Sequence, residues 1–200
     1  MNKLLKGRVS FKVFKPSVQI DSISDVRERV GRYSFKELKA SDMRDESTGW
    51  VDPLLSFDNE LFSSISHGEY LILGMRVDSF SLGAAVMRPH LEKAMYDFKN
   101  ENNLEYISAQ QKKEIQDRVK IKLKGSSVPR TKIVEMAWNH NSGLIYLCTQ
   151  SKTDVNKFVN LFEKTFDMTI SEFSVLDIVE KQGGSAGETI LSELWGTEND

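Results

Sequence analysis

The sequence contains a single cysteine, Cys148, and only four prolines among its 200 residues. One cysteine excludes an internal disulfide bond and is typical of proteins in a reducing cytosol. No apolar run approaches the roughly 18 residues of a membrane span, and the first residues contain no apolar core of a signal peptide. We therefore expect a soluble, cytoplasmic protein with no membrane partner.

Motifs for nucleotide and metal chemistry are also missing. There is no glycine-rich phosphate loop of the GxxxxGK[ST] type, and the run Gly183–Gly187 contains no lysine. The three histidines, His67, His90 and His140, are too far apart in the sequence for the ligand spacing of a zinc site. We expect no cofactor and no bound metal.

One pattern leaves catalysis open. Glu37 and Lys39 have the E-x-K spacing of one nuclease class, and Asp42, Asp45 and Glu46 follow closely. Clustered carboxylates can hold Mg²⁺, but E-x-K arises by chance in most proteins of this size, and here it falls in an expected loop. We predict no catalytic residue and no enzyme activity, with a divergent metal-dependent nuclease as the remaining alternative.

Charge is distributed unevenly along a chain of otherwise ordinary composition, with 40% hydrophobic and 28% charged residues. The first twenty residues contain five basic and no acidic side chains, and the last thirty contain seven acidic side chains and one lysine. Such an acidic tail is often a solvated end, but it could also cover a basic surface.

The strongest concentration of charge lies between Gln111 and Lys132. This stretch has eight basic and two acidic residues, a local net charge of +6 in a chain of net charge −2. Such segregation favours a surface that meets a polyanion, and the alternative is a solvated helix face. The candidates for DNA binding are Lys112, Lys113, Arg118, Lys120, Lys122, Lys124, Arg130 and Lys132, with Lys6, Arg8 and Lys12 as a second tier.

Hydrophobic periodicity predicts an α+β fold with a mostly antiparallel sheet. Ser108 and Gln111 predict a capping box, Ser151 is expected to cap a later helix, and Pro89 is placed in the first turn of its helix. Strands are expected at 8–14, 59–65, 70–77, 133–138, 144–149 and 170–179, and helices at 23–30, 82–100, 108–124 and 151–166.

Large side chains inside these elements are expected in the core. Trp50 and Trp138 are more typical of buried residues than of base-stacking surfaces. Arg76 lies within an apolar strand, so it must either face outward or pair with a buried acid. The outward alternative would add it to the DNA-facing set.

Several segments resemble parts of one protein family. Gly49–Pro53 resembles a Gly-Trp-Val-x-Pro segment, and the helix after the apolar strand 70–77 resembles a long tip helix. The stretch QKKEIQDRVKIKLK is similar to a lysine-rich Lys-Asp-x-Val segment. Pro129–Arg130 resembles part of a Leu-Pro-Arg-Ala-Phe motif, and Trp138 with Gly143–Ile145 resembles a Trp-x-Asp…Gly-Leu-Ile hairpin.

In this order, the segments resemble the recombination-associated RdgC family of bacteria over roughly residues 5–172, which corresponds to about the first half of a full-length member. The resemblance implies an α+β domain at 1–180, with a projecting helical tip at about 83–124. A flexible acidic tail is expected at 181–200. The resemblance also implies DNA binding without much sequence preference, pairing into a ring around the duplex, and restraint of recombinase filaments.

The leading hypothesis is therefore a nucleoid-associated homodimer that binds DNA through phosphate contacts and acts in recombination or replication, with a recombination protein as a further partner. Duplex is favoured because no alternation of aromatic and basic residues marks a single-strand stacking surface. The alternative is a protein-interaction module that keeps the fold and has lost DNA binding.

Overall fold

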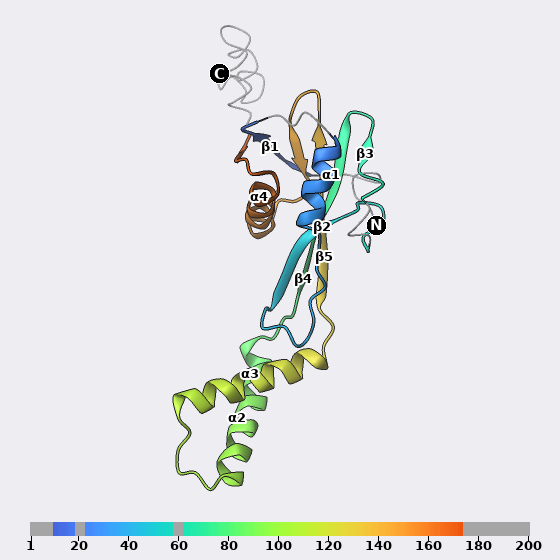
Figure 1. Ribbon diagram of the computed structural model, residues 1–200. Coiled ribbons are helices and arrows are strands. Elements are labelled where there is room, and N and C mark those ends of the chain that lie inside the picture. The colour runs from blue at the N-terminus through green and yellow to red at the C-terminus, as the bar shows by residue number, and fades with distance from the viewer. Residues whose placement is uncertain (1–9, 19–22, 58–61, 174–200) are drawn as a thin grey trace, which may run out of the picture.

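The computed structural model describes residues 10–18, 23–57 and 62–173 (Figure 1). No helix in these ranges is long and apolar enough to cross a membrane. The elements are β1 (Lys12–Pro16), α1 (Ile23–Arg32), β2 (Glu46–Val51), β3 (Ser66–His67), β4 (Tyr70–Ser79), α2 (Ala84–Glu101), α3 (Ala109–Gly125), β5 (Arg130–Asn139), β6 (Ile145–Leu147), α4 (Lys152–Phe166) and β7 (Ile170–Glu172).

One antiparallel sheet contains all the described strands. Its order is β2-β4-β5-β6-β1-β7, and the short strand β3 also pairs with β4. Each pairing in the sheet is antiparallel. With four helices added, the predicted α+β class is confirmed.

The two longest strands lead from the sheet to a projecting pair of helices. β4 and β5 pair over their whole length, from Tyr70 opposite Asn139 to Ser79 opposite Arg130. β2 accompanies them, with Glu46 opposite Ser79. Because α2 and α3 connect the far ends of β4 and β5, this helical pair extends away from the rest of the molecule (Figure 1). The predicted projecting helices are confirmed.

The core lies between the sheet and α4, which packs against α1 and β2. Trp50 is fully buried, and its indole Nε1 donates a hydrogen bond of 2.8 Å to Thr165 Oγ1 on α4. Trp138 is also buried and packs against the rings of Phe162 and Phe166. Both tryptophans therefore belong to the core, as predicted.

Arg76 pairs with a buried acid instead of facing outward. Its guanidinium donates two hydrogen bonds to the carboxylate of Asp78, of 2.9 and 2.7 Å, and Asp78 is only 2% exposed. The same guanidinium lies 4.2 Å from the ring centroid of Phe35. Arg76 thus compensates a buried charge and does not join the DNA-facing set.

Strand β2 was not predicted, because its sequence, ESTGWV, contains a glycine and little alternation. Gly49 allows a close approach of two backbone segments. A Cβ atom at this position would lie 2.5 Å from the Cα atom of Phe35, and Phe35 N–H donates a 2.8 Å hydrogen bond to Trp50 O. The glycine therefore marks backbone contact and not a loop.

Three further local predictions are wrong. Pro89 lies in the second turn of α2, where its missing N–H leaves the carbonyl of Ala85 without its usual helical donor. The helix expected at 23–30 continues to Arg32, so Gly31 lies inside α1 and does not end it. Residues 62–65 form no strand, and 59–61 lie outside the described residues.

Candidate nucleic-acid interface

Helix α3 carries most of the predicted basic residues, and its start is fixed by local hydrogen bonds. The N–H of Gln111 donates to Ser108 Oγ at 3.3 Å, and the N–H of Ser108 donates to Gln111 Oε1 at 2.9 Å. The predicted capping box is therefore confirmed. Further along α3, Ile115 and Val119 are buried, so the helix packs through its apolar side chains.

Lys124 anchors the base of α3 to the loop before β2. The side chain is only 1% exposed, and its Nζ donates to the carbonyl oxygens of Asp42 at 2.8 Å and Arg44 at 2.7 Å. It also forms an ion pair of 2.9 Å with Asp45. These bonds occupy the ammonium group, so Lys124 serves as an anchor and is withdrawn from the DNA-contact set.

Two other predicted basic residues are held by carboxylates. Lys120 forms an ion pair of 2.5 Å with Asp45, and this hydrogen bond, with a smaller contribution from Lys124, lowers the pKa of Asp45 despite partial burial. Lys132 pairs with Asp154 on α4. Burial of Asp154 favours its neutral form. The hydrogen bonds with Lys132, Thr149 and Ser151 favour the charged form and outweigh burial, so the pKa of Asp154 is lowered.

Of the second-tier residues, Lys12 is the one that falls within the described ranges. Lys12 forms an ion pair with Glu172 across the β1–β7 edge of the sheet. Lys6 and Arg8 lie outside the described residues.

Five predicted basic residues remain exposed and form no ion pair with any residue in the described ranges. They are Lys112, Lys113, Arg118, Lys122 and Arg130. Four lie on α3, and Arg130 begins β5 where the chain returns from the helical pair. All five can reach a ligand without breaking an existing ion pair.

The basic residues of α3 do not share one face of the helix. Arg118 and Lys122 are four residues apart and lie on the same face, which borders α2. Lys120 and Lys124 have the same spacing but point toward the loop that contains Asp45. Arg118 and Lys122 are therefore open to ligands, whereas Lys120 and Lys124 anchor the helix to that loop.

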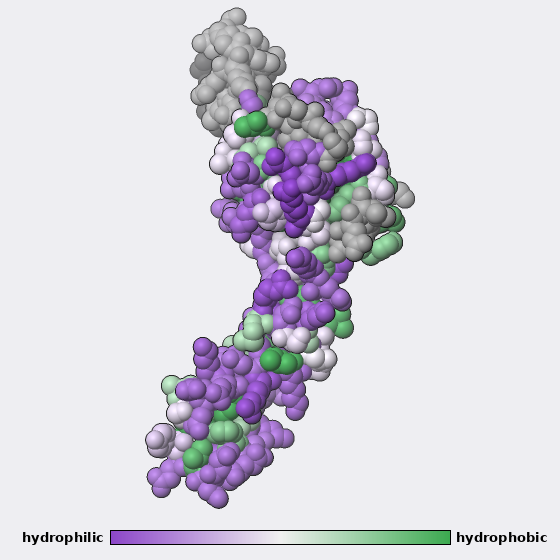
Figure 2. Space-filling model, viewed as in Figure 1, coloured by the Kyte–Doolittle hydropathy of each residue, from purple (hydrophilic) through white to green (hydrophobic). Residues whose placement is uncertain are grey.

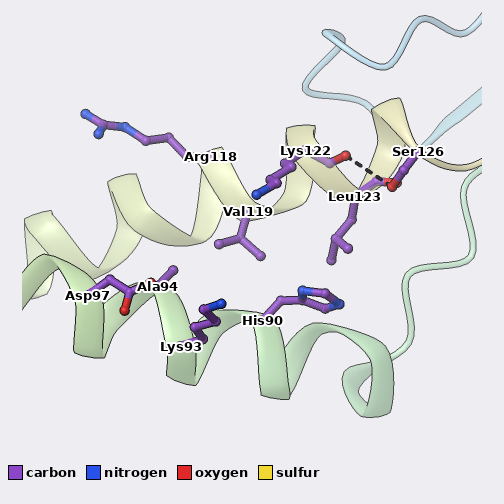
Figure 3. A pocket seen from close by; sticks show the side chains of 9 residues that line it. All are labelled: His90, Lys93, Ala94, Asp97, Arg118, Val119, Lys122, Leu123 and Ser126. Carbon is purple, nitrogen blue, oxygen red and sulfur yellow. Dashed lines mark hydrogen bonds between the residues drawn. The ribbon is translucent and has the colours of Figure 1, made fainter.

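A groove of about 620 Å³, which we call the first groove, lies between α2 and α3 (Figure 3). It is lined by His90, Lys93, Ala94 and Asp97 from α2, and by Arg118, Val119, Lys122 and Leu123 from α3, with Ser126 just beyond.

Sequence reasoning missed the contribution of α2 to the first groove. Basic and acidic residues alternate along α2, so no run of one charge marks it. The available signal was the helical spacing of His90, Lys93 and Asp97, which places these three residues on one face.

The second groove, of about 540 Å³, shares no residue with the first. Its apolar part is formed by Leu82, Met87, Leu91 and Met95, all half-buried, and Lys112 lies at its margin. Figure 2 shows hydrophobic surface along the helical pair, bordered by hydrophilic side chains. The helical pair therefore presents both cationic and apolar surface.

The carboxylates near the E-x-K pattern are engaged in other contacts. Asp42 accepts a hydrogen bond of 2.9 Å from Arg44, which lowers the pKa of Asp42. Glu46 pairs with Lys157 on α4. Within 10–18, 23–57 and 62–173, no group of three or more His, Cys, Asp or Glu side chains is placed to hold a metal ion.

Comparison with known proteins gives one relevant result. A family model described as "RdgC: Putative exonuclease, RdgC" matches residues 8–181 of the 200-residue chain. The match includes the described sheet, the helices that cover it and the projecting helical pair. The comparison with curated proteins gives no match.

Proposed function

Because the chain belongs to the RdgC family, to which residues 8–181 match, we propose that it binds DNA without sequence preference, as part of a general role in recombination. The family assignment confirms the resemblance seen in the sequence and supports the recombination role. Binding to DNA, and duplex as the favoured form, are the parts that we propose.

One observation carries the proposal. A chain of net charge −2 places five exposed basic side chains, with no ion pair in the described ranges, on and beside one projecting helix. Cations that are already paired would gain little from a phosphate, whereas these five can each neutralise one and release its counterions. Phosphate contacts of this kind are independent of base sequence.

The proposal is of binding without catalysis. The acidic residues near the E-x-K pattern support this, because Asp42 and Asp45 both form ion pairs with basic residues. The nucleoid of the cytoplasm is the proposed location, where DNA and a recombination protein would be the partners.

Fluorescence anisotropy with labelled duplex DNA of unrelated sequences tests the proposal. The test variant reverses three exposed charges outside the first groove, through Lys112→Glu, Lys113→Glu and Arg130→Glu. We expect affinity to fall at least about tenfold for every sequence, and the slope of log K against log salt to fall by about three.

A matched control reverses three exposed lysines on the body of the molecule, through Lys36→Glu, Lys152→Glu and Lys164→Glu. The total change in charge is the same, so equal weakening by both variants would contradict an interface on the helical pair. The wild-type protein should lose on the order of several hundredfold in affinity between about 50 and 200 mM salt, if all five residues contact phosphates.

Two other outcomes would overturn the proposal. If the wild-type protein binds no DNA at low salt, the protein-interaction alternative takes its place. If added Mg²⁺ leads to degradation of the DNA, and Glu37→Ala abolishes that degradation, then the chain is a nuclease and not only a binding protein.

A further inference from the structure

Helix α4 borders a groove to which the helical pair contributes no residue. This groove, which we call the α4 groove, has a volume of about 380 Å³ and is lined by Tyr33, Thr48, Lys157, Asn160, Leu161 and Lys164. We propose that it binds the acidic C-terminal segment of the same chain, residues 188–200. The inference goes beyond the proposed function and does not require that the chain binds DNA.

The α4 groove is built from elements that also share the core. Lys157, Leu161 and Lys164 follow one another at helical spacing, so they lie on one face of α4. Thr48 on β2 and Tyr33, the residue after α1, complete the lining. Because α4 packs against α1 and β2 (Figure 1), the positions of these side chains are fixed by the body of the molecule.

The charges of the lining favour an anion. It contains two lysines and no acidic residue. Lys164 is exposed and forms no ion pair with a described residue, and Lys157 pairs with Glu46, whose side chain is 40% exposed. An ammonium group has three N–H donors, so Lys157 can bind a second carboxylate as well.

The rest of the lining adds uncharged donors and an apolar surface. The hydroxyl groups of Tyr33 and Thr48 and the amide of Asn160 form no hydrogen bond with a described residue, so they can donate to a carboxylate. Leu161 and the ring of Tyr33, which is 40% exposed, supply apolar surface. The groove therefore suits a peptide that contains both carboxylates and apolar side chains.

Residues 188–200 have this composition. They contain four acidic residues and no basic one. Their large apolar residues are Ile190, Leu191, Leu194 and Trp195. The family match ends at residue 181, so the segment lies beyond it. The carboxylates complement the two lysines, and the apolar side chains can cover Leu161 and Tyr33.

The length of the chain permits docking within one molecule. α4 rises about 8 Å from Leu161 to Phe166, and the seven residues from Phe166 to Phe173 span at most about 25 Å. Phe173, the last described residue, therefore lies within about 33 Å of Leu161. The fifteen residues from Phe173 to Glu188 span up to about 50 Å when fully extended, which is enough to reach the groove.

The first groove is the rival site, because it is also lined by cations. It lies farther from the point where the described chain ends. Glu172 of β7 pairs with Phe14, which also pairs with Ile145. Ile145 pairs with Trp138 of β5, eight residues after Arg130, so the chain end lies about 26 Å along the strands from the start of β5. Proximity therefore favours the α4 groove.

Acrylamide quenching of Trp195 fluorescence tests the proposal in the full chain. Trp50 and Trp138 are both buried, and their emission is subtracted with a Trp195→Phe variant of each protein. The reference is a synthetic peptide of residues 182–200, in which the indole is open to the quencher.

Two variants alter the α4 groove, and each has a matched control. Lys164→Gln removes one charge, and Tyr33→Ala removes the aromatic ring. The controls are Lys152→Gln on α4 and Tyr106→Ala between α2 and α3, both at exposed positions outside the groove. Circular dichroism verifies that all four variants are folded.

We expect the Stern–Volmer constant of Trp195 to be at least about twofold lower in the wild-type protein than in the peptide. A tether of this length gives the segment a local concentration on the order of millimolar, so even weak docking is populated. Lys164→Gln and Tyr33→Ala should each raise the constant by about 1.5-fold or more, and the controls should leave it unchanged. Affinity for duplex DNA should change about threefold or less in both groove variants, because the α4 groove is distant from the helical pair.

Three outcomes would overturn the inference. Equal quenching in the wild-type protein and the peptide would show that the segment does not dock. Shielding that survives Lys164→Gln and Tyr33→Ala but is lost in Lys93→Glu would place the segment in the first groove. Shielding that appears only as the protein concentration rises would show that a second copy supplies the segment. A protein that binds no DNA would contradict the proposed function and leave this inference unaffected.

Discussion

Two lysines of α3, two positions apart, have opposite environments. Lys124 is almost fully buried and holds the carbonyl oxygens of Asp42 and Arg44 together with the carboxylate of Asp45. Lys122 is exposed and lines the first groove. A buried ammonium is tolerated only where polar partners replace its water, and Lys124 has three such partners.

Replacing Lys124 should therefore destabilise the protein. In Lys124→Met the side chain keeps much of its volume but leaves the carbonyls of Asp42 and Arg44 without their donor. We expect the free energy of unfolding to fall by about 2–4 kcal/mol, as measured by urea denaturation.

Lys122→Met is the matched control, with the same substitution on the same helix. We expect it to change the free energy of unfolding by less than about 0.5 kcal/mol, because its side chain makes no bond to the described residues. Equal stability of the two variants would show that the Lys124 contacts do not anchor α3.

The sequence indicated where positive charge is concentrated but not which lysine would be buried. The oxygens that bind Lys124 come from a loop 79 to 82 residues earlier in the chain, so no local pattern identifies them. Arg76 is different, because its partner Asp78 lies two residues away on the same strand. A period of two places both side chains on one face, and the pairing was among the predicted alternatives.

At the scale of elements, α3 begins at a site that local sequence determines. Ser108→Ala removes the side-chain acceptor for the N–H of Gln111 and should destabilise the first turn by about 1 kcal/mol. Hydrogen exchange of the amides in this turn should become about fivefold faster, provided that they exchange through local opening.

Ser81→Ala provides the control for that variant. Ser81 precedes α2, is exposed, and makes no side-chain hydrogen bond within the described ranges. Its replacement should leave exchange in α3 unchanged. If Ser108→Ala and Ser81→Ala give the same exchange rates, the capping box does not stabilise the start of α3.

Helix positions were predicted well, whereas the groove between the helices was not. A capping box spans four residues, so its sequence signal is complete within a short window. The first groove requires α2 and α3 to pack with His90 opposite Leu123, and that orientation depends on tertiary contacts. Charge runs identify only one side of such a groove.

The whole molecule joins a sheet to a pair of helices that have few buried side chains. Alternating apolar residues predicted the α+β class and the antiparallel strands, because these depend on local periodicity. The strand order β2-β4-β5-β6-β1-β7 could not be predicted in the same way, since it depends on which strands meet across long stretches of chain. None of the residues of α2 is buried, so the helical pair leaves apolar surface exposed.

That apolar surface supports our proposal of a homodimer. Met87, Leu91 and Met95 line the second groove and remain half-exposed in a single chain. A second copy that covered them would remove this apolar surface from water and so stabilise association. Met95→Lys should weaken association at least about tenfold. In a dimer, the new lysine would be buried without a partner for its charge, whereas in the monomer its ammonium group can extend into water.

Sedimentation velocity over a range of protein concentrations measures this effect. Tyr96→Lys is the control, because Tyr96 is the next residue of α2, is 67% exposed and does not line the second groove. We expect the wild-type protein and Tyr96→Lys to form dimers at concentrations where Met95→Lys is monomeric. A wild-type protein that stays monomeric throughout, or equal dimerisation of all three, would contradict pairing through this groove.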